Sequence, residues 1–147
     1  GDPEPGLAAL AAYRRAFRPS AQQPEPRVSV SLDGFVADTA AEAADLLLPE
    51  AWAMAVSRTT GSFPPLEPVG AVRAAVRTSR QQQHLERTAA MAITGTPASA
   101  GSRLAELLER TGAVELVAAG STTDRAALAA SDAALAALMG SPAVSPA

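Results

Sequence analysis

The spacing of apolar residues changes repeatedly between two patterns along the chain. Segments with an apolar residue every three or four positions, as on one face of a helix, alternate with short runs typical of β-strands. This alternation predicts an α/β fold. Successive strands separated by helices are parallel, so we expect right-handed helical crossovers between them.

Three segments are predicted to be strands. The clearest covers residues 27–37, where apolar and polar residues alternate from Val28 to Leu32. Shorter apolar runs at 91–94 and 113–119 predict the other two. Strand-helix units are therefore expected to start near residues 27, 90 and 113.

One alternative remains open at the first strand. Asp33-Gly34 is a sequence that favours a tight turn, so residues 28–32 could pair with residues 35–37 as a hairpin. The return strand of such a hairpin would be short.

Helices are expected before, between and after these strands along the chain. Their approximate ranges are 7–17, 39–58, 69–76, 79–90, 97–111 and 124–140. Capping boxes are predicted at Thr39–Glu42 and Ser79–Gln82. Pro49 is expected to kink or restart the second helix, because its ring clashes with the carbonyl four residues earlier.

Charge and composition exclude several classes of function. With 12 basic and 15 acidic residues the net charge is −3, which argues against a nucleic-acid partner. No apolar run approaches the roughly 20 residues of a membrane helix, so no membrane partner is expected. The absence of cysteine and the single His84 argue against a metal site and thiol catalysis. We expect a cytoplasmic protein.

Few residues stand out as catalytic candidates. Ser31 and Asp33 are predicted to point away from the helix-packed face of the first strand, toward the interior if the sheet closes into a barrel. An exposed strand serine and a turn aspartate are the more common explanation of these two residues. His84 is interpreted as a solvated histidine in a polar helix, Trp52 as a core residue rather than a ligand stacker, and Glu115 as a solvated charge rather than a base.

Five short motifs occur in order over nearly the whole chain. They are Tyr13-Arg14-Arg15-Ala16-Phe17-Arg18-Pro19-Ser20, Ala37-Asp38-Thr39 with Glu42-Ala43, Phe63-Pro64-Pro65-Leu66, Gly95-Thr96-Pro97, and Arg110-Thr111-Gly112-Ala113 with Glu115-Leu116. In this order the chain resembles the C-terminal part of the luciferase-like flavin-dependent monooxygenases. It departs from that family at Val114, where aspartate is common, and at residues 120–123, which replace aromatic or histidine residues.

The resemblance implies the C-terminal part of a (β/α)8 barrel of the TIM type, using FMN or the deazaflavin coenzyme F420. Residues 27–139 would form the partial barrel, after a tail and helix at 1–26 and before a tail at 140–147. Ser31, Asp33, Thr94 and Ser121 are its candidate substrate-pocket residues, and no catalytic or flavin-contacting residue is assigned.

An incomplete barrel needs a partner. A complete α/β barrel takes about 250 residues, and the chain begins at Gly1 rather than Met without a signal peptide. We therefore expect a missing N-terminal barrel half, or a second copy in a homo-oligomer, and no turnover by the chain alone. The alternative is a noncatalytic α/β domain that dimerises through exposed sheet edges.

Overall fold

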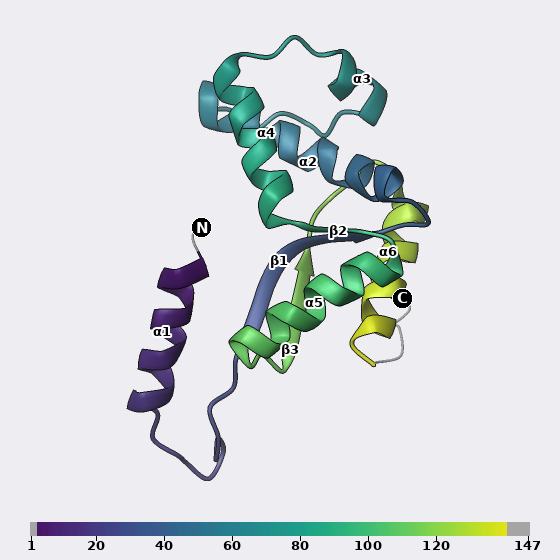
Figure 1. Ribbon diagram of the computed structural model, residues 1–147. Coiled ribbons are helices and arrows are strands. Elements are labelled where there is room, and N and C mark those ends of the chain that lie inside the picture. Colours follow the sequence, from purple (N-terminus) through teal and green to yellow (C-terminus); the bar gives the residue numbers. More distant parts are fainter. Residues whose placement is uncertain (1–2, 141–147) are drawn as a thin grey trace.

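The computed structural model describes residues 3–140 and shows a small parallel sheet surrounded by helices (Figure 1). Its elements are α1 (Pro3–Ala16), β1 (Ser29–Val36), α2 (Ala40–Thr60), α3 (Val69–Ala74), α4 (Ser79–Met91), β2 (Ile93–Gly95), α5 (Pro97–Thr111), β3 (Glu115–Ala119) and α6 (Arg125–Leu138). The α/β prediction is confirmed. No helix among the described residues is both long and apolar enough to cross a membrane.

The sheet has three parallel strands in the order β2-β1-β3. β3 pairs with β1 from Ser29 to Asp33, whereas β2 pairs only with residues 34–36 at the carboxyl end of β1. The hairpin alternative is wrong. Gly34 pairs with Ile93 inside a continuous strand and lacks the positive φ that its turn would require.

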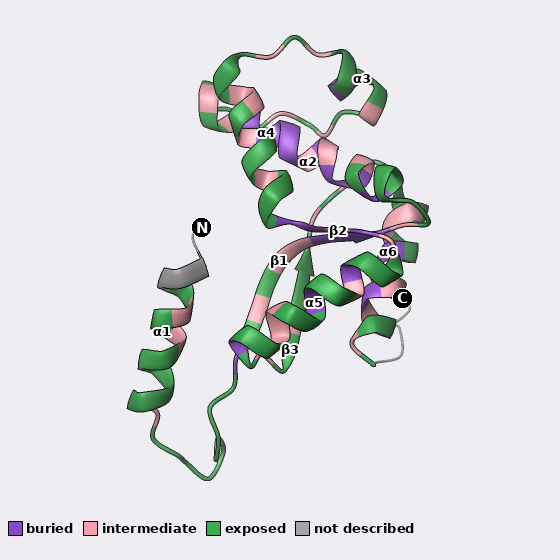
Figure 2. Ribbon diagram, in the orientation of Figure 1, coloured by how far each residue is buried: buried purple, intermediate pink, exposed green. Residues whose placement is uncertain are grey.

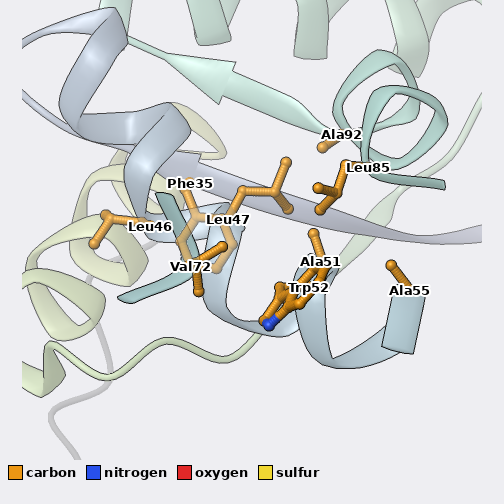
Figure 3. Close-up of a cluster of buried hydrophobic side chains, with 9 residues drawn as sticks. All are labelled: Phe35, Leu46, Leu47, Ala51, Trp52, Ala55, Val72, Leu85 and Ala92. Carbon is orange, nitrogen blue, oxygen red and sulfur yellow. The ribbon is translucent and has the colours of Figure 1, made fainter. Parts of the chain in front are cut away.

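At the carboxyl end of β1, the two faces of the strand pack against different helices, because successive strand residues point to opposite sides. Phe35 belongs to a buried cluster built mainly from α2, with Trp52 and Val72 among its members (Figure 3). Val36 belongs to a second cluster with Leu104 of α5 and Leu135 of α6. The core is thus split into two parts by the carboxyl half of β1.

Local capping signals position most of the helices. Thr39 and Glu42 form the predicted capping box of α2, and Asp124 caps α6. The box of α4 lies one residue earlier than predicted, at Thr78 and Gln81. Since Thr78 and Ser79 are both followed by glutamine three positions later, the sequence alone does not distinguish the two boxes.

Of the two outcomes expected at Pro49, a kink or a restart, the restart is wrong, because α2 continues through this residue. A second expectation about proline is also wrong. α1 begins at Pro3, although the proline and glycine content of residues 1–5 predicts no helix there. Proline is tolerated in the first helical turn, where no intrahelical partner awaits its missing N–H. Of the predicted tail at 140–147, residues 141–147 lie outside the described residues.

Candidate functional site

An open groove runs along one edge of β1. β2 covers that edge only at residues 34–36, and the edge residues before them line a cavity of about 650 Å³ that α5 bounds on the other side. We call this cavity the edge groove; it is lined by Val30, Ser31, Leu32 and Asp33 of β1, by Ala90, Met91 and Ile93, and by Arg103, Glu106, Leu107 and Arg110 of α5.

The structure brings two of the four predicted pocket residues together. Ser31 is exposed and Asp33 is half-buried, and both line the edge groove. They alternate with Leu32, which packs in the cluster formed with α5 and α6, so both lie on the opposite face of the strand.

The other two predicted pocket residues lie elsewhere. Thr94 is half-buried in the middle of β2 and pairs with Phe35 in the ladder. Ser121 is exposed after β3, and its backbone N–H donates a hydrogen bond to the Glu50 carboxylate. Neither of these residues lines the edge groove or the cleft described next.

A second, smaller cavity of about 230 Å³ lies between α2 and α4. We call it the interhelical cleft; it is lined by Asp33, by Leu47, Glu50, Ala51, Met54, Ala55 and Arg58 of α2, and by His84, Arg87, Thr88 and Met91 of α4. The α4 residues are spaced three, four and seven positions from His84, and those of α2 follow the same helical period. Each helix therefore presents one stripe of side chains to the cleft.

The interhelical cleft changes the interpretation of His84. This residue was expected to be solvated, but it is half-buried, and its Nε2 atom is buried without a hydrogen-bond partner in the described structure. Burial, followed by the positive charges of Arg58, Arg80 and Arg87, lowers the pKa of His84 below its usual value of 6.5. The neutral imidazole is therefore favoured near neutral pH.

Trp52 and Glu115 have the structural roles that were predicted. Trp52 is 6% exposed in the core, where its indole Nε1 donates a 2.7 Å hydrogen bond to Glu67. Glu115 is exposed at the start of β3 and accepts a 2.6 Å hydrogen bond from the Ser29 hydroxyl. Among the side chains that the structure describes, from residue 6 to residue 140, no group of three or more acidic or histidine residues could hold a metal ion.

One face of the β1–β3 pair is left largely uncovered. Residues of β3 are exposed or half-buried along the whole strand (Figure 2), and Val117 is 50% exposed. Val117 pairs with Ser31, which is also exposed. Parallel strands in α/β proteins are usually covered on both faces, so this arrangement is unusual for a self-contained sheet.

Comparison with known proteins identifies a structural relative but no family. No family model matches the chain, and no curated protein matches it. Among solved structures, the chain is similar to the crystal structure of apo-MsnO8, with a TM-score of 0.73 and 22% sequence identity over 92% of this chain. The match spans 42% of the MsnO8 chain, less than half of its length. The likeness establishes a shared fold over most of the present chain.

Proposed function

We propose that this chain is the C-terminal portion of a luciferase-like flavin-dependent oxidoreductase, in which it supplies part of the barrel wall and of the substrate pocket. The observation that carries the proposal is the incompletely covered sheet. One face of the β1–β3 pair is exposed. In addition, the edge of β1 that pairs with β2 at residues 34–36 is open from Val30 to Asp33. Further strands from the same protein would cover both.

The strand order bears directly on this proposal. In a simple barrel, each strand pairs with the strand that follows it in the sequence, so three consecutive strands would have the order β1-β2-β3. Here β1 lies between β2 and β3. β2 occupies only the carboxyl end of its edge of β1, opposite residues 34–36. In the proposed barrel, β1 and β3 are strands of the barrel wall. A strand from an earlier part of the longer protein would pair with β1 along the edge groove, at the residues of β1 that precede its pairing with β2.

The ordered motifs, which extend from Tyr13 to Leu116, support the same conclusion. The likeness to MsnO8 covers 92% of this chain but 42% of the MsnO8 chain, less than half of its length, which supports a longer protein. The proposed oxidoreductase activity therefore belongs to a longer protein that would contain this chain, and not to the chain alone.

The two cavities that are lined by arginine do not fit a whole flavin by themselves. The interhelical cleft, which contains Arg58 and Arg87, measures about 230 Å³, below the roughly 300–1,000 Å³ of typical ligand pockets. The edge groove is larger, but it lies beside an unpaired strand edge that the proposed barrel would fill. FMN or F420 would therefore be held mainly by residues outside this chain, while Ser31 and Asp33 contribute to the substrate side.

Titration of the chain with FMN and with F420, followed by cofactor fluorescence, tests the proposal. We expect no stoichiometric complex with either cofactor and no acceleration by the chain of the oxidation of reduced flavin. Stoichiometric binding with turnover by the chain alone would overturn the partial-barrel assignment. Sedimentation of the chain in the same buffer tests the alternative, a noncatalytic domain that pairs through its sheet edges. That alternative would be favoured if the chain formed a stable dimer and the longer protein also failed to bind either cofactor.

A further inference from the structure

On its α2 side, the interhelical cleft is lined by a negative and a positive side chain that are about two helical turns apart. Arg58 of α2 acts electrostatically on His84 of α4, which places both at one end together with Arg87. Glu50 lies eight residues before Arg58 on α2, a separation of about 12 Å along a helix that rises 1.5 Å per residue. Glu50 and Asp33 line the cleft as its acidic residues.

From this arrangement we infer that the end of the interhelical cleft formed by Arg58, His84 and Arg87 binds an oxyanion of the phosphate class, either free or carried on a small molecule. This inference goes beyond the proposed function and does not depend on it. It concerns a site contained entirely within the described residues of this chain.

The two arginines of the site are available for a ligand. The side chains of Arg58 and Arg87 are exposed, and among the described side chains of residues 6–140 neither makes a hydrogen bond or an ion pair. Arg73, by contrast, forms an ion pair with Asp45, and Arg103 donates a 2.8 Å hydrogen bond to the Ala92 carbonyl. Guanidinium groups bind phosphate oxygens through paired N–H donors, which suits two unpaired arginines on facing helices.

His84 supplies the third donor. Its Nε2 is buried, lacks a partner in the described structure and belongs to a residue that lines the cleft. Buried polar atoms are rarely left without a partner, so this imidazole nitrogen lacks a hydrogen-bond partner that an anion can supply once a covering side chain moves aside. Three positive charges act on this imidazole: Arg58 of α2 and Arg80 and Arg87 of α4. Two carboxylates, those of Glu50 and Asp33, line the same cleft.

An oxyanion would reverse the electrostatic environment of His84. Without a ligand, the neighbouring arginines disfavour a positively charged imidazole. A bound anion offsets their charge and accepts a hydrogen bond from the protonated imidazole, so binding raises the pKa of His84. By linkage, protonation of His84 must strengthen anion binding to the same extent.

Because His84 is the sole histidine, its imidazole resonances report on the site without ambiguity. We propose an NMR titration of the chain with inorganic phosphate and, separately, with glycerol phosphate, at constant ionic strength maintained with chloride. Saturable shifts of the His84 resonances and a raised His84 pKa are expected. Tighter binding of glycerol phosphate would indicate an oxyanion carried on a small molecule, and equal binding would indicate the free ion.

Charge-matched variants distinguish a site from general attraction. Arg58→Gln and Arg87→Gln are expected to weaken phosphate binding on the order of tenfold each, as loss of a charged hydrogen-bond donor does. Arg80→Gln removes the same charge near His84, but Arg80 does not line the cleft, so binding should change less than about twofold. Thermal unfolding of all three variants checks that they remain folded.

Two results would overturn the inference. One is the absence of a saturable phosphate effect on His84 in the unmodified chain. The other is an equal loss of binding in Arg58→Gln and Arg80→Gln while both variants unfold at the temperature of the unmodified chain, because that result would indicate nonspecific charge attraction.

Discussion

The backbone N–H of Val36 donates a 2.8 Å hydrogen bond to the hydroxyl of Ser131, which is completely buried on α6. The ladder between β1 and β3 ends at Asp33, three residues before Val36. Beyond that point β3 no longer provides a carbonyl, so a serine hydroxyl takes over as acceptor. The contact fixes α6 against the carboxyl end of the central strand.

Replacement of this serine should destabilise the fold. Ser131→Ala leaves the buried N–H of Val36 without an acceptor, and we expect a loss of about 1–3 kcal/mol in the free energy of unfolding. Chemical denaturation measures the loss. Ser102→Ala is the matched control, because Ser102 is exposed on α5 and its hydroxyl bonds only to a carbonyl of its own helix. An equal effect of the two substitutions would contradict this role of Ser131.

Gly120 allows the chain after β3 to pass close to Phe35. Its φ is +131°, and an added Cβ would lie 2.7 Å from the ring. Gly120→Ala should therefore cost about 2–4 kcal/mol of unfolding free energy through backbone strain and overpacking. Gly70→Ala in α3 is the control, since a Cβ added there would meet no atom within 4 Å. It should be neutral or slightly stabilising, and a large loss there would argue against this account.

The hydrogen bond between Trp52 and Glu67 holds the loop between α2 and α3 against α2. Glu67→Ala should lower the free energy of unfolding by about 1–2 kcal/mol, because the indole N–H loses a charged acceptor. The sole tryptophan should also fluoresce at longer wavelength as water reaches its ring. Glu67→Gln retains an acceptor oxygen and should preserve most of both properties. Unchanged emission in Glu67→Ala would show that the contact is unimportant.

The stability of the chain should depend on the ionisation of His84. The pKa of His84 is lowered in the folded chain, so the unfolded chain binds more protons just below pH 6.5. The free energy of unfolding should therefore decrease as the pH falls from neutral through 6.5 toward the folded pKa. His84→Gln should reduce this dependence in that range. An identical pH profile for the variant, measured by urea denaturation, would exclude His84 as its source.

The sequence predicted the features that depend on neighbouring residues. The capping box at Thr39, the helix starting at Pro97 and the strand through Asp33 all follow from spacings of a few residues. The strand order did not follow, because the pairing of β3 with Ser29 joins residues 86 positions apart. Such pairing is decided by which strand buries the most surface.

The interhelical cleft was missed for a related reason. His84 follows three glutamines, and this polar context favoured a solvated side chain. The usable signal was the recurrence of Arg87, Thr88 and Met91 at helical spacing from His84, which marks one face of α4. That this face meets Arg58 of α2 depends on packing between two helices. Of the predicted pocket residues, only Ser31 and Asp33 lie together.

The most direct test of the central claim is the intact mass of the protein that carries this sequence in its source cells. The proposed C-terminal barrel portion predicts a mass well above the 14.9 kDa of the present chain, larger by on the order of 100 residues, since a complete barrel takes about 250. A mass of 14.9 kDa would contradict the proposal and leave the chain as a self-contained α/β domain.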